Sequence, residues 1–297
     1  MKRSFFKTSF AALGAGLRQA LQWRLLLLWL IATALPTLVL SLPVGRVLAD
    51  ALDYSAQANQ WAQRLDLVMV QDLGERVARQ GAALGGAGTV AGVLLVFLFP
   101  LLNAMFAAAA RSPRVLHFGE LLHAGLSDYG PMLRLVLFAL VPLGIALGLG
   151  AVASKAAHRY GEHAILSADA DLVKGIAIGV GVLLFVLAHA SIVAGRAWLT
   201  LLPRRRSAFV ALWRGVKLVF FHPLRSLMLY LGITLPVLLL ISVLGVLRVE
   251  IPSGSVAGSL LGVLVVQCIA VLAGWMHFAR LLAMLSLVRQ RAHVALR

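Results

Sequence analysis

The sequence predicts an all-α integral membrane protein that crosses the bilayer six times. Of its 297 residues, 61% are hydrophobic and only 13% are charged, whereas soluble domains carry about 25% charged residues. The apolar residues form six stretches without Asp, Glu, Lys or Arg, and none of these stretches is shorter than 20 residues. A helix of this length spans a hydrocarbon layer of about 30 Å. We therefore expect one polytopic membrane domain over residues 1–297.

The six spans are expected to pair into three helical hairpins. Their predicted bounds are about residues 25–45, 85–108, 133–154, 174–195, 226–247 and 256–277. Nineteen Lys and Arg residues lie on the side that holds both termini, and eight lie on the other side. Because Lys and Arg accumulate on the cytoplasmic side, we expect both termini in the cytoplasm and the spans in a bacterial inner membrane.

The first span has an alternative interpretation as a cleaved signal peptide. Lys2, Arg3 and Lys7 precede it, and Ala49-Asp50-Ala51 resembles a cleavage site with small residues. However, the apolar core has 18 or more residues, whereas a signal sequence has about 7 to 15. We therefore expect the span to be retained.

Each hairpin is expected to begin with an amphipathic helix on the cytoplasmic side. At an offset of 90 residues, Pro113 aligns with Pro203 and Gly125 with Gly215, which suggests an internal repeat. The predicted helices, with apolar residues at helical spacing, are Phe5–Trp23, Phe118–Met132 and Ala208–Phe221. Such helices lie in the membrane interface. Each is expected to be an elbow that orients the next span, with a surface for lipid or a partner as the alternative.

On the extracytoplasmic side, residues 47–79 form the longest predicted segment outside the spans. Their apolar residues follow helical spacing, and acidic residues are interspersed with arginines. This pattern predicts one or two amphipathic helices with a solvated charged face, and cation binding is the alternative.

Glycine pairs at GxxxG spacing predict tight helix packing, mostly in the outer half of the membrane. The pairs are Gly81/Gly85, Gly88/Gly92, Gly144/Gly148, Gly175/Gly179 and Gly258/Gly262.

Three polar residues at predicted membrane depth are candidate functional residues: Asn103, His189 and Gln267. Hydrogen bonding between helices is the simplest role for them. Apart from Arg134 and Lys174 at the ends of two predicted spans, no acidic or permanently basic residue lies inside one, which argues against a transporter coupled to protons or sodium.

Neither catalysis nor nucleic-acid binding has a recognisable motif. The formal net charge is +16, but most basic residues flank the spans and match no groove-reading pattern. His158, Glu162, His163 and Asp169 are a conceivable metal cluster, although their spacing matches no standard motif. With the lone Cys268 inside an apolar stretch, we predict no catalytic residue, metal or cofactor.

Short segments before two of the spans carry a resemblance to a known group. They are Phe118-Gly119-Glu120-Leu121-Leu122, Pro203-Arg204-Arg205-Arg206-Ser207-Ala208-Phe209 and Trp213-Arg214-Gly215. In these segments and in the order of its features, the chain resembles uncharacterised bacterial six-span proteins similar to the membrane domain of some glycerophosphodiester phosphodiesterases. The phosphodiesterase domain itself is missing from this sequence, so the resemblance implies no catalytic residue.

The leading hypothesis is a non-enzymatic inner-membrane protein that acts as a transport-associated or scaffold subunit. Its basic fourth connection is expected to contact anionic lipid or a protein partner, which includes a second copy of the chain. The predicted contact residues are Arg196, Arg204, Arg205, Arg206, Arg214 and Lys217. The alternatives are a permease for a lipid or small hydrophobic solute, and then a lipid-modifying enzyme of the membrane.

Overall fold

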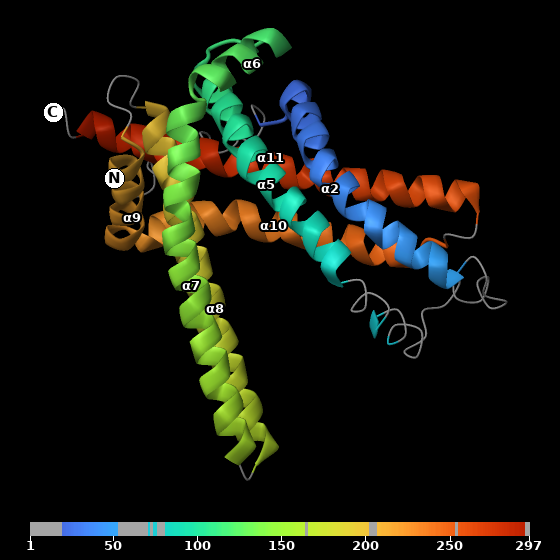
Figure 1. Ribbon diagram of the computed structural model, residues 1–297. Coiled ribbons are helices and arrows are strands. Elements are labelled where there is room, and N and C mark those ends of the chain that lie inside the picture. Colours follow the sequence, from blue (N-terminus) through green and yellow to red (C-terminus); the bar gives the residue numbers. More distant parts are fainter. Residues whose placement is uncertain are drawn as a thin grey trace. The chain divides into compact units, whose positions relative to one another are not determined.

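The computed structural model describes eight helices within residues 20–52, 71, 74–75, 81–163, 166–201, 207–252 and 255–294 (Figure 1). The helices are α2 (Trp23–Leu52), α5 (Gly81–Arg111), α6 (Phe118–Ser127), α7 (Tyr129–His163), α8 (Ser167–Leu201), α9 (Ala208–Phe221), α10 (Pro223–Glu250) and α11 (Val256–Val294). The predicted helix Phe5–Trp23 and most of the predicted segment 47–79 lie outside the described residues.

Six of these helices are long and apolar enough to cross a bilayer, which confirms the all-α polytopic fold. They are α2, α5, α7, α8, α10 and α11. Each is longer than its predicted span because a helix does not stop where its charge-free stretch stops. Two of them, α7 and α8, have 35 residues each, which corresponds to about 52 Å of helix against a hydrocarbon layer of about 30 Å.

The described chain divides into two compact units. Unit 1 contains Asn103–Ile233 and the chain from Phe278 onward, and unit 2 contains Leu21–Leu102 and Thr234–His277. Helices α5, α10 and α11 each contribute one part to each unit. In unit 1 the C-terminal part of α8 packs on α9, Arg111 at the end of α5 pairs with Asp128 after α6, and Arg289 of α11 donates to the Ala110 carbonyl of α5. We call this part of unit 1 the basic end.

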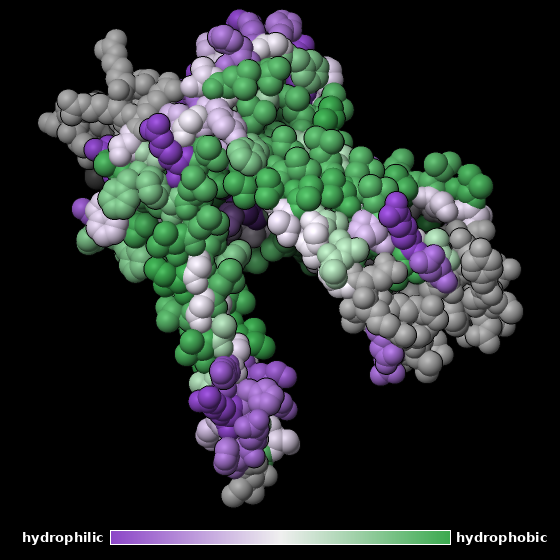
Figure 2. All heavy atoms as spheres, in the orientation of Figure 1, coloured by the Kyte–Doolittle hydropathy of each residue, from purple (hydrophilic) through white to green (hydrophobic). Residues whose placement is uncertain are grey.

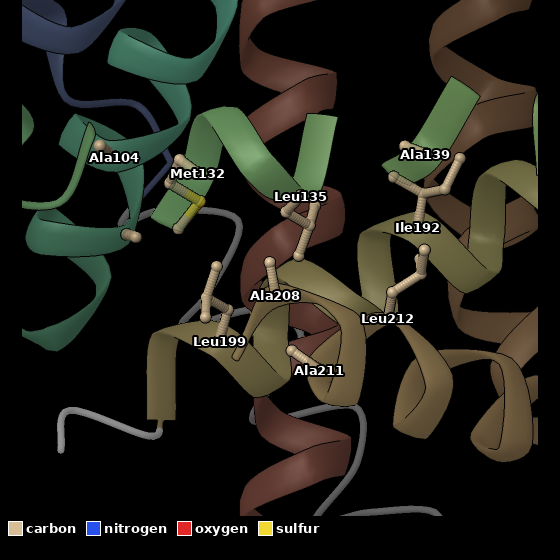
Figure 3. Close-up of a cluster of buried hydrophobic side chains, with 10 residues drawn as sticks. Ala104, Met132, Leu135, Ala139, Ile192, Leu199, Ala208, Ala211 and Leu212 are labelled. Atoms are coloured by element: carbon tan, nitrogen blue, oxygen red, sulfur yellow. The ribbon is translucent and has the colours of Figure 1, made fainter. Parts of the chain in front are cut away.

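The core of unit 1 is built from small and branched side chains of four helices (Figure 3). The cluster comprises Ala104 and Ala107 of α5, Met132, Leu135 and Ala139 of α7, Ile192 and Leu199 of α8, and Ala208, Ala211 and Leu212 of α9. Alanines let the helix backbones approach closely, and the larger side chains fill the space between them. The core therefore fixes α9 against α7 and α8.

Three helix segments of unit 1 are buried on every face. They are residues 103–110 of α5, 190–197 of α8 and 278–285 of α11. Phe106 and Phe278, both fully buried, stack with their ring centroids 5.0 Å apart and join α5 to α11. A helix that is buried all round has protein rather than lipid on each side, so the densest packing lies at the basic end.

Glycines allow α8 and α9 to touch backbone to backbone. A Cβ atom on Gly215 of α9 would lie 2.4 Å from both the amide nitrogen of Gly195 and the carbonyl oxygen of Ser191 on α8. Gly195 itself faces Leu212, whose Cα atom would lie 3.0 Å from an added Cβ. A side chain at position 215 would therefore force the two helices apart.

Helices α7 and α8 run side by side as an antiparallel hairpin (Figure 1). Their closest glycine contact joins Gly150 and Gly181, which are not members of a predicted GxxxG pair. A Cβ atom added to most of the paired glycines would meet nothing within 4 Å, as holds for Gly81, Gly85, Gly88, Gly92, Gly144, Gly148, Gly175 and Gly179. The prediction of tight packing is therefore wrong for these four pairs. In the fifth pair, a Cβ atom on Gly262 of α11 would lie 2.8 Å from the Arg248 side chain of α10, so that glycine does lie at a close contact.

In unit 2, aromatic rings connect α2, α5 and α11. His277 stacks on Trp29 with centroids 5.3 Å apart and meets Phe99 edge-on, also at 5.3 Å. Gly274 of α11 permits this approach, because a Cβ atom there would lie 2.6 Å from the Trp29 ring. The ring contacts therefore hold α2 against one face of α11.

The amphipathic helix predicted at Ala208–Phe221 is confirmed as α9, whereas the one predicted at Phe118–Met132 is interrupted. Helix α6 ends at Ser127, and Asp128 separates it from α7. Asp128 is buried and forms an ion pair with Arg111 at the end of α5. That ion pair fixes the break between α6 and α7, and Arg111 lies 17 residues before Asp128 in the sequence.

Candidate functional site

Helix α9 has two faces with different chemistry. The inner face consists of Ala208, Ala211, Leu212, Gly215, Leu218 and Val219, all of them buried. The outer face exposes large aromatic side chains, with Phe209 60%, Trp213 53%, Phe220 67% and Phe221 74% exposed. Ser207 caps the helix by accepting a hydrogen bond from the amide of Val210. This combination is typical of a helix that lies in a membrane interface.

Two of the predicted contact residues, Arg214 and Lys217, lie on the exposed part of α9. The guanidinium carbon of Arg214 is 5.3 Å from the Trp198 ring centroid, and the Lys217 Nζ atom is 5.6 Å from the Trp213 ring centroid. Cations held over indole rings near a membrane surface keep their charge available to solvent or headgroups. Arg204, Arg205 and Arg206 lie outside the described residues.

Arg196 lies in a different environment from the one expected of it. The sequence placed it in the fourth connection, but α8 continues to Leu201 and the Arg196 side chain is 7% exposed. Arg280, which was expected to follow the last span, likewise lies inside α11 and is 8% exposed. The expectation that the spanning helices carry no basic residue is therefore wrong, because the charge-free stretches are shorter than the helices.

Arg280, Tyr230 and His189 are linked by hydrogen bonds within unit 1. The Arg280 Nη1 atom lies 3.3 Å from the Tyr230 hydroxyl, and that hydroxyl lies 2.9 Å from His189 Nδ1. The Arg280 guanidinium carbon also sits 4.8 Å from the centroid of the Tyr230 ring. Arg196 follows His189 by seven residues on α8, which is about two helical turns. We call these four residues the arginine cluster.

The other two candidate polar residues occupy dissimilar surroundings. Asn103 of α5 is 2% exposed and belongs to unit 1. Gln267 of α11 belongs to unit 2 and is exposed. Of the three residues predicted at membrane depth, only His189 is thus part of the arginine cluster.

Between α5 and α6, two ion pairs organise the chain. Arg111 pairs with Asp128, and Arg114 donates to Glu120 with an Nη2–Oε1 distance of 2.5 Å. Glu120 also accepts a hydrogen bond of 2.9 Å from the His117 amide at the start of α6. The Arg114 side chain and the His117 amide lower the pKa of Glu120. These acidic residues therefore have structural roles at the basic end.

The far end of the α7–α8 hairpin is hydrophilic (Figure 2). His158 Nδ1 lies 3.3 Å from Glu162 Oε1 one helical turn away, and His163 Nδ1 lies 2.9 Å from the Arg159 carbonyl oxygen. Among the described residues, no three His, Cys, Asp or Glu side chains come close enough to share a metal ion. The structure thus does not assemble the conceivable cluster of His158, Glu162, His163 and Asp169.

Comparisons with protein-family models, curated proteins and solved structures gave no match. The interpretation of the site therefore depends on its chemistry.

Sequence reasoning did not identify Tyr230 and Arg280 as site residues. Tyr230 stands among apolar residues in the fifth predicted span, and Arg280 immediately follows a charge-free stretch, where a basic residue is ordinary. Only the fold brings α10 and α11 together with α8 at this point. The available signal was the presence of a tyrosine at predicted membrane depth, and the protein has only four tyrosines.

Proposed function

We propose that the protein is a non-enzymatic inner-membrane protein that contacts anionic phospholipid at its basic end and acts there as a scaffold or transport-associated subunit. The observation that supports this proposal most is the outer face of α9, where exposed aromatic rings alternate with Arg214 and Lys217. Aromatic residues favour the membrane interface, while Lys and Arg are attracted to anionic headgroups. The proposed orientation places α9 at the cytoplasmic surface, with the α7–α8 tip outside.

The repeated order of elements supports the scaffold part of the proposal. Helices α5 and α8 end 90 residues apart, at Arg111 and Leu201, and α6 and α9 begin 90 residues apart, at Phe118 and Ala208. Each long helix is thus followed by a short helix at the basic end. A structure that repeats one hairpin with its interfacial elbow suits a platform for lipid and protein contacts, in keeping with an internal repeat.

A lipid-enrichment experiment tests the proposal. The full-length protein is incorporated into vesicles of equal parts phosphatidylglycerol and phosphatidylcholine, re-extracted, and its retained lipids are quantified. Each cation contributes about 1 kcal/mol of attraction, so the double variant Arg214→Gln/Lys217→Gln is expected to lower the preference for phosphatidylglycerol by about 30-fold at low salt. Adding 1 M NaCl should reduce the preference of the unmodified protein, because the Debye length falls to about 3 Å.

The matched control removes the same number of charges from the other end. Lys155 and Lys174 are exposed near the tip of the α7–α8 hairpin, and the variant Lys155→Gln/Lys174→Gln is expected to retain the preference. An equal loss in both variants would mean that net charge alone governs lipid retention. No preference in the unmodified protein would remove the proposal.

The second candidate function is a permease for a lipid or small hydrophobic solute. The observation in its favour is the polar chain of His189, Tyr230 and Arg280 within helices that are long enough to span the membrane. Proteoliposomes that carry a fluorescent phosphatidylglycerol analogue distinguish the two functions. A permease accelerates transfer of the analogue between leaflets, whereas a scaffold retains anionic lipid without accelerating transfer.

A further inference from the structure

Helix α6 carries a stripe of large apolar side chains that unit 1 leaves open. Phe118, Leu122 and Leu126 follow one another at intervals of four residues, so they lie on one face of the helix. They are 38%, 47% and 60% exposed, respectively. The buried residues of the helix, Leu121 and Gly125, lie beside this stripe. We call the three exposed residues the apolar stripe of α6.

The rest of α6 is polar but carries almost no charge. Gly119, His123 and Ser127 are exposed, and the helix contains no Lys or Arg. Its one acidic residue, Glu120, pairs with Arg114. Membrane binding by an amphipathic helix scales with the apolar area that it buries, plus the attraction of basic residues to anionic headgroups. Only the first of these two contributions is open to α6.

The connections of α6 hold it at the level of the membrane surface. The spanning helix α5 ends at Arg111, and only residues 112–117 separate it from α6. On the other side, Asp128 alone separates α6 from the spanning helix α7. The ion pair between Arg111 and Asp128 ties these two connections together. A helix held this closely to the ends of two spans lies where acyl chains give way to water.

The surroundings of α6 favour lipid as the partner of the apolar stripe. On α7, Leu137, Val141 and Ile145 are 47%, 61% and 58% exposed, and such side chains on a spanning helix face acyl chains. Because one residue separates α6 from α7, the bilayer around α7 reaches α6 as well. A stable protein interface needs about 20–30 residues on each side, whereas insertion among lipid headgroups needs only a short apolar face.

We propose that α6 inserts its apolar stripe among phospholipid headgroups and senses how loosely the lipids pack. Looser packing opens more acyl surface to Leu122 and Leu126, so that more apolar area is buried. The ligand is therefore a loosely packed or curved lipid surface, whatever the charge of its headgroups. This inference goes beyond the proposed function, in which α9 recognises negative charge through Arg214 and Lys217.

A fluorescent probe on the stripe tests the proposal in the full-length protein. In a Cys268→Ser background, Leu122→Cys is labelled with an environment-sensitive dye and reconstituted into palmitoyl-oleoyl phosphatidylcholine or the more loosely packed dioleoyl phosphatidylcholine. The emission is expected to shift to shorter wavelength in the dioleoyl lipid, because the stripe inserts more deeply there. An unchanged emission, or a shift to longer wavelength, would overturn the proposal.

Two matched controls separate insertion from a general effect of lipid on the dye. His123→Cys places the dye next to the stripe but on the polar side of α6, at an exposed position, and its emission should stay close to that in water in both lipids. Val141→Cys places the dye on the exposed surface of a spanning helix. A shift at either control position that equals the shift at position 122 would overturn the packing response of α6.

The same labelled protein tests which partner covers the stripe. Replacing half of the lipid with phosphatidylglycerol, or adding 1 M NaCl, should leave the emission at position 122 unchanged, because α6 has no basic residue for salt to screen. Loss of the shift in salt would assign α6 an electrostatic contact instead. An emission that depends on the protein-to-lipid ratio would mean that a second copy of the chain covers the stripe. Either result would overturn the proposal.

Hydroxyl-radical footprinting provides a measurement on the unmodified protein, so that it does not depend on a variant. Oxidation of Leu122 and Leu126 is expected to be lower in dioleoyl than in palmitoyl-oleoyl vesicles, because inserted side chains are shielded from water. Equal oxidation in the two lipids would contradict the proposal.

The lipid contacts of α6 and α9 fail separately. The variant Arg214→Gln/Lys217→Gln is expected to lose the preference for phosphatidylglycerol and to keep the packing response at position 122. A preference for phosphatidylglycerol without a packing response removes the role of α6 and leaves that of α9. A packing response without that preference does the reverse.

Discussion

At the scale of single residues, Gly215 of α9 has no space for a side chain where it contacts α8. Replacing Gly215 with alanine puts a methyl group 2.4 Å from backbone atoms of Gly195 and Ser191, and backbone atoms cannot move aside as a flexible side chain does. Overpacking of a tight core costs about 1–3 kcal/mol, so Gly215→Ala is expected to lower the melting temperature of the purified protein.

Gly144→Ala is the matched control for that substitution. Gly144 also lies inside a helix of unit 1, but a Cβ atom there would meet nothing within 4 Å. Alanine is favoured over glycine in a helix by about 0.5–1 kcal/mol, so this variant should melt at the same or a higher temperature. Equal destabilisation by both substitutions would contradict the close approach of α8 and α9.

A second prediction at this scale concerns His222, between α9 and α10. Partial burial lowers the pKa of His222, and the positive charges of Arg291 and Arg225 lower it further. In the unfolded chain a histidine titrates near a pKa of about 6.5. The unfolded state therefore binds more protons just below that pH, and stability decreases as the pH falls from about 7.5 through 6.5.

His222→Gln is expected to remove part of this pH dependence. Between about pH 8 and pH 5.5, the melting temperature should decrease less steeply with falling pH in the variant than in the unmodified protein. His123→Gln, which changes an exposed histidine of α6, serves as the control for a general effect of losing an imidazole. Identical slopes for His222→Gln and the unmodified protein would show that the arginines near His222 do not affect its titration.

At the scale of elements, the closest glycine contact of the α7–α8 hairpin, between Gly150 and Gly181, tests which helix faces meet. A Cβ atom on Gly181 would lie 3.5 Å from the Gly150 Cα atom, whereas one on Gly179 would meet nothing within 4 Å. Gly181→Leu should therefore separate the helices and lower the melting temperature, while Gly179→Leu should be tolerated. If Gly179→Leu is the more damaging variant, the face of α8 that meets α7 is assigned wrongly.

The same hairpin illustrates what sequence reasoning can and cannot provide. Charge-free stretches locate α7 and α8 because lipid excludes charged side chains along most of a span. The spacing of glycines did not identify the contact of Gly150 with Gly181, because which faces meet depends on the packing of the whole unit. Local periodicity predicted α9 well, whereas the end of α6 depends on Arg111, which lies 17 residues from Asp128.

The candidate site, like the hairpin, was predictable from the sequence only in part. Arg214 and Lys217 were predictable because a basic connection between spans is a local feature of the sequence. The hydrogen-bonded chain of His189, Tyr230 and Arg280 was not, because Tyr230 is 41 residues from His189 and 50 residues from Arg280. Each of these residues alone has an ordinary explanation, and only the fold places them together.

At the scale of the whole molecule, the proposed lipid contact depends on the side of the membrane that the basic end faces. Anionic lipid gives the cytoplasmic leaflet a negative surface potential. If α9 lies on that side, its cations are next to the lipids proposed to bind them. If α9 lies on the other side, the proposed lipid contact loses its physical basis.

Cysteine labelling in cells tests that orientation most directly. In a Cys268→Ser background, single cysteines are introduced by Glu162→Cys at the hairpin tip and by Ser207→Cys before α9, both at exposed positions. With a maleimide that does not cross the inner membrane, the account predicts labelling of position 162 in intact cells, and of position 207 only after the membrane is disrupted. Labelling of position 207 but not of position 162 in intact cells would contradict the account.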